Sequence, residues 1–173
     1  VGPLRAISRI VMAPMDVALD EANRIGERYR EFLGQRAGTG LGWVATGGLA
    51  VRGDGLSSPH QIRLDSEGDT DGLLLLTDRV HQEGGKLVVQ LTHAGRQTLS
   101  STIGGDPVAP SPIPCPMMRQ RPRELSAGEM PGLIDAFAGA ARRAARAGAD
   151  GVELHMGHGY LLNQFLSPAS NTR

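Results

Sequence analysis

The sequence is short of cysteine, aromatic side chains and long apolar runs, and neither sign of charge is in excess. Its single cysteine, Cys115, excludes an internal disulfide, and its Pro-rich surroundings favour a bystander thiol over a nucleophile. The zero net charge argues against a nucleic-acid surface, because phosphate binding needs clustered Lys and Arg. No apolar run approaches the roughly 18 residues of a membrane span, and no charged-then-apolar leader is visible. We therefore expect a cytoplasmic protein whose partners include neither nucleic acid nor membrane.

Glycine, in contrast, is abundant, and its distribution favours an ordinary globular domain. The 24 glycines follow no collagen period, so they suit tight turns between strands and helices. A chain of 173 residues fits one domain. The composition thus predicts a single unit with many short connections.

Short apolar runs alternate with amphipathic stretches along the chain. The apolar runs, which predict strands, are residues 9–14, 41–46, 86–91 and 152–154. The amphipathic stretches, which predict helices, are residues 23–36, 70–83 and 131–147. Strands and helices in alternation imply right-handed crossovers and a parallel sheet. This order alone leaves open both a doubly wound sheet and an α/β barrel.

Capping signals mark the expected starts of the later helices. Thr70 can cap the second helix. Ser126 and Glu129 have the spacing of a capping box before the third helix, where Pro131 fits the first helical position. The long, Pro-rich stretch 97–125 before this box predicts an irregular loop, and loops of that length are usually functional.

Two histidines and a tyrosine follow the last predicted strand within six positions: His155, His158 and Tyr160. Donors at the carboxyl end of a strand are typical of the chemistry of α/β barrels, and the small residues between them let the backbone pass close to a flat ligand. The histidines could instead form a structural pair or bind a metal ion. Glu153 is the only nearby carboxylate or thiol and lies within the strand, so we expect no metal site.

Four stretches of the chain match one known family in order and spacing. They are RIVMAPM (residues 9–15), VATGGLAV (44–51), KLVVQLTHAGR (86–96) and HMGHGYLLNQFLSPASNTR (155–173). Together they resemble the signatures of the Old Yellow Enzyme family, the FMN-dependent ene reductases and NADH:flavin oxidoreductases. After its fourth strand this family has His-x-x-His or His-x-x-Asn followed by Gly-Tyr-Leu, and the present chain resembles the double-histidine form.

The resemblance implies a fold. Between the two parallel architectures it selects the (β/α)8 TIM barrel, of which this α/β chain would form the N-terminal half, with four parallel strands and alternating helices. We expect residues 1–173 to be a single partial domain, the N-terminal half of an FMN-binding barrel. A half barrel exposes sheet edges and apolar helix faces, so a homo-oligomer is compatible with it.

The resemblance also implies roles for the polar residues after the last strand. His155 and His158 are expected to hold the carbonyl oxygen of the substrate, because two N–H donors stabilise the enolate that forms as hydride arrives. Tyr160 is expected to give a proton to the α-carbon, although a tyrosine packed at a barrel rim is the alternative. Arg96 is a weaker candidate for substrate binding, since it could meet an anionic group or lie solvated in its loop.

The residues that the resemblance assigns to FMN binding are Ala13, Pro14, Met15, Asp16, Gly47, Gln90 and His155. The carboxamide of Gln90 donates and accepts at once, which suits the paired C=O and N–H edge of the flavin pyrimidine ring. Gly47 permits close approach of the backbone. Asp16 departs from the family pattern, which has Thr or Cys there. An ionised carboxylate cannot donate and repels reduced flavin, so either Asp16 points away or the match slips by one residue here.

The implied function is that of an NAD(P)H-dependent flavin oxidoreductase of the ene reductase type. It would take hydride from NADH or NADPH and pass it through FMN to the activated C=C bond of an α,β-unsaturated carbonyl compound, an enone or related small molecule. The alternative is a non-catalytic half barrel or pseudoenzyme without bound flavin. We expect the isolated fragment to be inactive, because barrels commonly bind phosphate after strands seven and eight.

Overall fold

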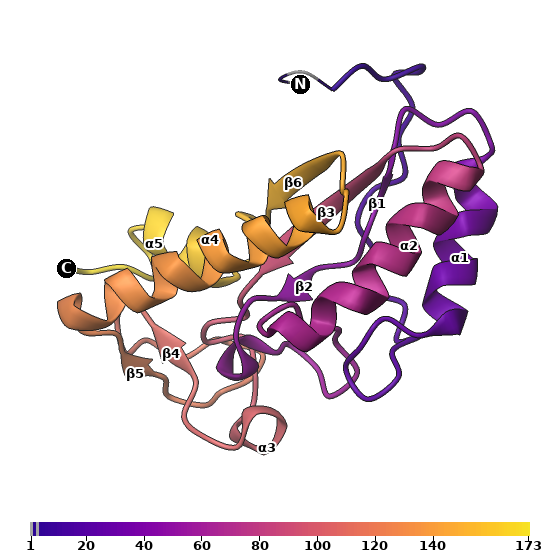
Figure 1. The fold of residues 1–173 in the computed structure, drawn as a ribbon. Coiled ribbons are helices and arrows are strands. Elements are labelled where there is room, and N and C mark those ends of the chain that lie inside the picture. The colour runs from indigo at the N-terminus through magenta and orange to yellow at the C-terminus, as the bar shows by residue number, and fades with distance from the viewer. Residues whose placement is uncertain (1, 3) are drawn as a thin grey trace.

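The computed structural model describes residues 2 and 4–173 and is built around one parallel sheet (Figure 1). Its strands are β1 (Val44–Ala45), β2 (Leu49–Ala50), β3 (Leu87–Thr92) and β6 (Gly151–Leu154). The central strand β3 pairs with each of the other three, and every pairing is parallel. The structure therefore confirms the parallel α/β arrangement predicted from the order of strands and helices.

The second predicted strand, residues 41–46, is shorter than expected and resumes after a break. Its parts β1 and β2 lie along the same side of β3, with Val44 opposite Leu87 and Leu49 opposite Leu91. Side chains bond the backbone between them: the Thr46 hydroxyl accepts from the Gln90 N–H at 3.0 Å. The two glycines thus divide the predicted strand into two short strands, and both of these pair with β3.

The first predicted strand, residues 9–14, is reduced to a single parallel bridge between Met12 and Val44. The Met12 N–H donates to Trp43 O at 3.0 Å, but this segment lies at the edge of the sheet and pairs on one side only. Pro14 has no N–H with which to extend the ladder. Its apolar run suggests a strand covered on both faces, but Ile10 is 71% exposed, so this segment is not covered in that way.

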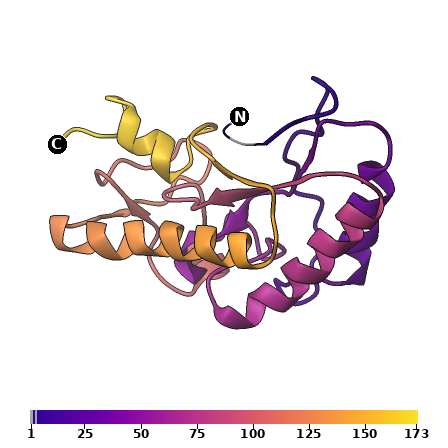
Figure 2. The same cartoon turned by 45° about the horizontal axis from the view of Figure 1, so that its top comes forward.

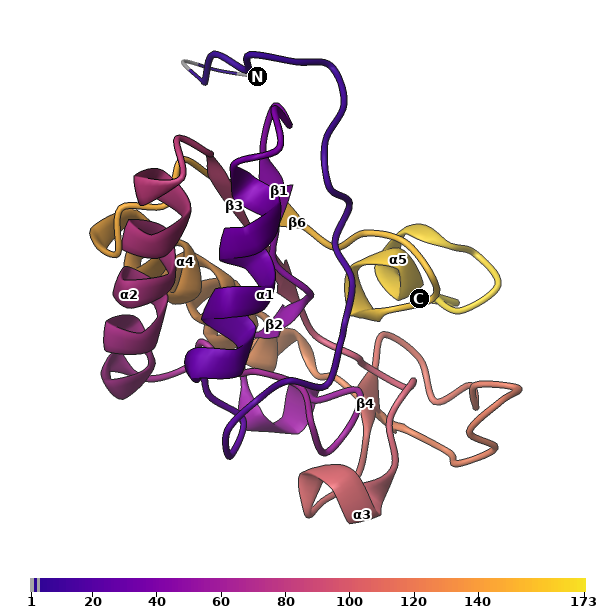
Figure 3. The same cartoon turned by 90° about the vertical axis from the view of Figure 1, so that its right-hand side faces the viewer.

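Three helices cover one face of the sheet, as Figure 3 shows. They are α1 (Glu27–Ala37), α2 (Thr70–Gln82) and α4 (Met130–Arg146). The core between helices and strands is mainly apolar and includes Leu33, Leu64, Leu73, Leu76, Val80, Leu87, Val89, Leu91, Ala140 and Ala144. Burying each large aliphatic side chain contributes about 1.5–3 kcal/mol, so this layer fixes the strands whose carboxyl ends carry the site.

Two helices start differently from the prediction, and local contacts explain both differences. Helix α1 starts at Glu27 and not at Asn23, because Asn23 has a left-handed backbone (φ +62°) that no helix tolerates. Thr70 is the first residue of α2 and not its cap. The capping box that precedes it is formed by Ser66 and Asp69, whose side chains bond each other's backbone.

The start of α4 agrees with the sequence. The Ser126 N–H and hydroxyl both donate to Glu129 Oε2 at 2.8 Å, which confirms the predicted capping box. Pro131 is the second residue of the helix, where a missing N–H costs nothing. The Arg123 guanidinium and the Ser126 bonds hold the pKa of the Glu129 carboxyl low, at about 2, so the box persists to acidic pH.

The segment 97–125 is less irregular than expected. It contains α3 (Ser100–Ile103) and a small parallel pair, β4 (Val108–Ala109) and β5 (Arg123–Glu124). This pair packs against α4 and the last helix, α5 (Leu161–Leu166), through a second apolar cluster. Figure 2 shows α5 and the C-terminal end set apart from α1 and α2. Among the described residues, no helix combines the length and the apolar character needed to cross a bilayer.

Asp150, just before β6, is a polar anchor of the sheet, and its loss should weaken the fold. Its Oδ2 accepts from the Leu87 N–H at 2.9 Å and lies 2.7 Å from His81 Nε2, while Lys86 Nζ lies 2.9 Å from Oδ1. We expect Asp150→Asn to lower the free energy of unfolding by about 1–3 kcal/mol, because an NH2 group replaces one of the two oxygens that accept these bonds and the negative charge beside Lys86 is lost. Urea denaturation at pH 7 would measure this loss.

The same anchor predicts a pH dependence. Burial raises the pKa of the Asp150 carboxyl, but its bonds to His81, Lys86 and the Leu87 amide outweigh burial and leave the pKa below the usual value. The stabilisation is therefore present above pH about 3.9, the ordinary aspartate pKa, and is lost as pH falls through the lower folded pKa. The difference between wild type and Asp150→Asn should shrink over that acid range, and a constant difference would contradict this account.

Candidate functional site

A cavity of about 460 Å³ opens at the carboxyl ends of β3 and β6. It brings together segments that are far apart in sequence, from the first bridge segment to the turn after β6. The predicted site residues that line it are Ala13, Pro14, Met15, Asp16, Gln90, His155, His158 and Tyr160. Gly48, Ser57, Gln61, Thr92, Glu153, Leu154, Met156 and Gly157, which the sequence did not single out for a site, complete the lining.

Three rings form the most distinctive part of this lining. The His155 ring lies between its two neighbours, with its centroid 5.1 Å from that of His158 and 4.7 Å from that of Tyr160. Both pairs are edge-to-face, at 86° between ring planes. The backbone of β6 positions the central ring, because the His155 N–H donates to Leu91 O at 2.9 Å and continues the ladder past the end of the strand.

The hydrogen bonds around His155 determine its tautomer. Its Nδ1 accepts from the Gly157 N–H at 3.3 Å, so a neutral His155 carries its proton on Nε2. That Nε2 lies 3.4 Å from His158 Nδ1, at the side of the ring that faces the second histidine. Burial, and then the nearby His158, lower the pKa of His155 below its usual value. His155 is therefore a neutral Nε2–H donor at pH 7.

His158 adopts a backbone conformation that few residues tolerate. Its φ of +55° is left-handed, and Gly159 follows with φ +75°. The turn is held by side chains: Gln97 Nε2 donates to His158 O at 2.6 Å, and Asn163 Oδ1 accepts from the Gly159 N–H at 2.9 Å. Histidine and asparagine are both enriched in left-handed conformations and both carry a side-chain N–H donor. This position therefore suits the two residue types found in the family's His-x-x-His and His-x-x-Asn pattern.

Gln164, which the sequence analysis missed, ties the turn after β6 to the turn after β3. The residue is 1% exposed, and its Nε2 donates to Ala94 O at 3.1 Å and to Gly159 O at 2.6 Å. Its Oε1 accepts from the Arg96 N–H at 3.3 Å. Two adjacent amide side chains, Asn163 and Gln164, between apolar residues of a short helical stretch were the only sequence signal available. These bonds fix the position of His158 and Tyr160 relative to the end of β3.

The two glycines after β1 allow the backbone to pass close to the cavity. A Cβ on Gly47 would lie 2.7 Å from Met15 O, and one on Gly48 would lie 2.9 Å from Thr92 Cγ2. Gly47 itself is behind the lining, where its N–H donates to the Tyr29 hydroxyl at 2.8 Å. Burial keeps the pKa of that phenol high, so Tyr29 stays neutral. Any side chain at either glycine would displace the segment that forms the cavity wall.

Arg96 is placed differently from the prediction, whereas Asp16 lies at the cavity where it was expected. Arg96 does not line the cavity: its Nη1 donates to Ile113 O at 3.0 Å and ties down the following loop, so the structure does not support an anion contact there. Asp16 does line the cavity rim and is exposed, and its Oδ1 accepts from the Ala18 N–H at 3.3 Å. A carboxylate acceptor therefore stands at this part of the rim.

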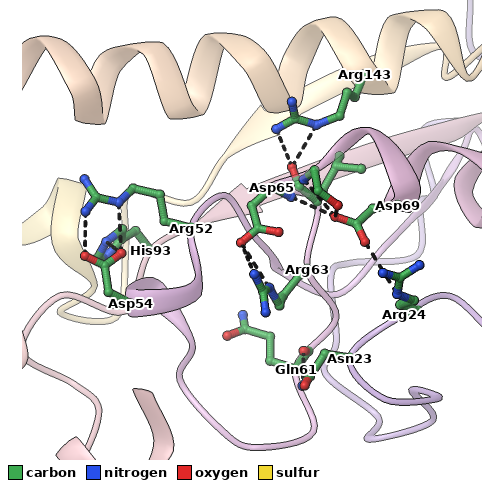
Figure 4. A network of polar contacts seen from close by, with 12 residues as sticks. Asn23, Arg24, Arg52, Asp54, Gln61, Arg63, Asp65, Asp69, His93 and Arg143 are labelled. Atoms are coloured by element: carbon green, nitrogen blue, oxygen red, sulfur yellow. Dashed lines mark hydrogen bonds and ion pairs between the residues drawn. The ribbon is translucent and has the colours of Figure 1, made fainter. Parts of the chain in front are cut away.

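His93 belongs to a separate polar network shown in Figure 4. Its Nδ1 accepts from the Gly95 N–H at 3.1 Å, and its Nε2 lies 3.4 Å from Asp54 Oδ1. Arg52 binds the same carboxylate through two nitrogens, at 2.9 and 2.7 Å. His93 is 1% exposed, so this network braces the turn after β3 from behind the cavity.

The lining fits a flat, polar-edged ring system such as that of a flavin. The Gln90 amide and the backbone of residues 13–16 offer the donors and acceptors that such a ring edge needs. Thr92 also lines the cavity, and its hydroxyl is buried without a hydrogen-bond partner among the described residues. Within the described residues, no three His, Cys, Asp or Glu side chains are grouped so that they could hold a metal ion.

Comparisons with known proteins agree with this geometry. A sequence model of the NADH:flavin oxidoreductase / NADH oxidase family matches residues 1–173. The chain is 40% identical over 176 residues to a NADH oxidase of Thermoanaerobacter brockii, a match that covers all of this chain and 27% of that protein. The chain therefore spans about a quarter of that relative.

Solved structures are similar over nearly the whole chain. A morphinone reductase N189A mutant in complex with tetrahydroNAD superposes with a TM-score of 0.93 at 28% identity, covering 99% of this chain and 51% of that one. The Old Yellow Enzyme homologue of Zymomonas mobilis gives 0.92 at 32% identity, covering 97% and 50%. These likenesses confirm the predicted fold, part of a TIM barrel with parallel strands and helices.

Proposed function

Since the chain belongs to the NADH:flavin oxidoreductase / NADH oxidase family, which includes the Old Yellow Enzyme, we propose that it forms the flavin-ring side of an ene reductase. The complete protein would take hydride from NADH or NADPH and give it to the activated C=C bond of an enone or related small molecule. One observation carries this proposal: a neutral His155 donor, His158 and Tyr160 share one cavity with the Gln90 amide.

Each side chain has a task that its geometry supports. Gln90 and the backbone of residues 13–15 would hold the ring of FMN, which when bound supplies the two-electron redox chemistry. The Nε2–H of His155 would donate to the carbonyl oxygen of the substrate, with His158 as the second donor. These donors stabilise the negative charge that develops on that oxygen. Each donor typically lowers the free energy of the transition state by about 3–4 kcal/mol.

Tyr160 would complete the reaction by giving a proton to the α-carbon of the substrate. Its ring lies against that of His155, so the phenol and the donor to the substrate oxygen face the same part of the cavity. Proton transfer from a positioned group requires hydrogen-bond reach in the substrate complex. Helix α5 begins directly after Tyr160, and the Tyr160 N–H donates to Gly157 O at 3.1 Å, which fixes the backbone of the residue.

The alternative, a non-catalytic half barrel, receives no support from the site. A pseudoenzyme has no need to keep a donor pair, a phenol and a ring-binding amide in one cavity. Here those groups are joined by a turn with a left-handed histidine and a buried glutamine. Backbone conformations of this kind persist where the surrounding structure holds them and are concentrated at functional sites.

Replacing Tyr160 by phenylalanine separates the two half-reactions. We expect reoxidation of the reduced protein by an enone to slow by about 10²-fold, the lower range for loss of a general acid. Reduction by NAD(P)H should change little, because it needs no proton from this phenol. Anaerobic stopped-flow absorbance of the flavin would follow both steps separately, and equal reoxidation rates in the two proteins would assign the proton donor elsewhere.

The proposed reaction is tested most simply by product analysis. The complete protein, supplied with FMN and NADPH or NADH, should convert 2-cyclohexenone to cyclohexanone with one nicotinamide oxidised per product. Oxygen must be excluded, because reduced flavin also reacts with it. Nicotinamide oxidation without any saturated ketone would restrict the proposal to a flavin-dependent oxidase or a reductase of other acceptors.

A further inference from the structure

We propose that Glu153 is a positioning residue for Gln90: it fixes which end of the carboxamide faces the cavity and so sets the site to recognise a ring N–H flanked by carbonyl oxygens. This inference rests on the proposed function and deepens it, because it names the polarity of the flavin-ring edge that the strands present. Neither the motif nor the expected site residues include Glu153.

The two side chains are neighbours by strand register. Gln90 on β3 lies directly opposite Glu153 on β6 in the parallel ladder. Gln90 Nε2 donates to Glu153 Oε1 at 2.5 Å, and both residues line the cavity. Charge-assisted bonds of this kind are shorter and about twice as strong as neutral ones. The contact therefore decides the orientation of the amide.

The chemistry of the partner removes the usual ambiguity of an amide. An ionised carboxylate has no proton to donate, so only the NH2 end of Gln90 can face it. The oxygen end must then point the other way, toward Gly48, where an added Cβ would lie 3.3 Å from Gln90 Oε1. Within the described part of the chain, no hydrogen bond to that oxygen is formed. The acceptor is left for a ligand.

The backbone and burial of Gln90 oppose any other orientation. Its N–H donates to the Thr46 hydroxyl at 3.0 Å, and the residue is only 7% exposed. Turning the amide over would set its oxygen against the Glu153 carboxylate, and acceptor against acceptor is repulsive. The site thus offers one acceptor, Oε1, and the remaining N–H of Nε2. That order matches a ligand edge with an N–H beside a C=O, as in the pyrimidine ring of a flavin.

Isosteric exchanges test the pairing in the complete protein, with dissociation constants for FMN and for N3-methyl-FMN as the readout. In Glu153→Gln the partner can donate as well as accept, so Gln90 loses its fixed orientation. FMN should then bind about tenfold more weakly, the loss expected for one hydrogen bond. Binding of N3-methyl-FMN, which has no N–H to offer, should change less than twofold between the same two proteins.

The same exchange in a second background separates positioning from a general charge effect. In Gln90→Glu two carboxylates face each other, and FMN binding should fall further. Adding Glu153→Gln to that variant restores a donor–acceptor pair with the acceptor still toward the cavity, so FMN should bind about tenfold more tightly than to Gln90→Glu alone. The exchange at Glu153 is thus expected to weaken binding in one background and strengthen it in the other.

Each outcome is decisive. Equal FMN affinity in wild type and Glu153→Gln, or an effect of the same sign in both backgrounds, would overturn the positioning role while leaving the proposed function standing. A wild-type protein that binds no FMN would instead contradict the proposed function and this inference together. Circular dichroism and thermal unfolding of all four proteins confirm that the differences arise in folded protein.

Discussion

Reoxidation by an enone is expected to slow by about 10²–10³-fold when His155 is replaced by alanine, the usual loss for one donor to a developing oxyanion. His155 is neutral at pH 7 and carries its proton on Nε2, since Nδ1 accepts from Gly157. Alanine removes that donor and leaves His158 without the ring it contacts. Stopped-flow reoxidation of the reduced protein, and the affinity for a phenolic ligand in the same pocket, should both report the loss.

A matched control is available three residues further on. His158→Asn keeps a side-chain donor and a residue that tolerates φ +55°, so we expect less than a tenfold loss. His158→Ala has neither property and should lose more. Unchanged enone turnover and unchanged phenol affinity in His155→Ala would show that the substrate oxygen binds elsewhere.

A second large effect, a loss of FMN affinity, is expected when the 173-residue chain is tested alone. The cavity-lining residues would contact the ring of the proposed flavin, whereas α/β barrels commonly bind phosphate in the loops after strands seven and eight. Each charge-assisted hydrogen bond to a phosphate contributes about 1.5–3 kcal/mol. Without several of them, a nanomolar site would move toward the millimolar range. Titration with FMN, followed by quenching of flavin fluorescence, would measure this.

The open edges of the sheet should make the isolated chain associate with itself. At one edge Ile10 is 71% exposed, and at the other Val152 and Leu154 are 40% and 48% exposed. Apolar strands without a neighbour favour association, so the isolated chain should form dimers or larger species whose size rises with concentration. Analytical ultracentrifugation would detect this. A monomeric chain with submicromolar FMN affinity would contradict both the expected phosphate contribution and the expected association.

The sequence predicted the sheet well where the apolar pattern of a single segment is enough to identify a strand. The run 86–91 is apolar at four of its six positions and corresponds to β3, whose residues are all buried. The sequence did not predict features of the sheet that depend on contacts between residues far apart in the chain. The break between β1 and β2 depends on Thr46 bonding Gln90 and on Gly47 bonding Tyr29, and neither partner is near in sequence.

In the site, too, some residues could be predicted from the sequence and others could not. The family resemblance placed Gln90, His155, His158 and Tyr160 together, and the structure brings them into one cavity. Residue type alone could not show that Arg96 turns away, because the carbonyl that it binds belongs to Ile113 in a loop. The contacts of Glu153 and Gln164 arise from strand register and from the packing of two turns, which no local pattern reveals.

The most direct test of the central claim is whether the complete protein binds flavin at this cavity and exchanges electrons through it. Purified protein mixed with equimolar FMN should give a yellow, stoichiometric complex that NADH or NADPH bleaches without oxygen and that 2-cyclohexenone restores. The Gln90→Ala variant should retain less flavin under the same conditions. A protein that stays colourless after gel filtration, or a complex that neither nicotinamide reduces, would contradict the assignment of this cavity as the ring side of an ene reductase.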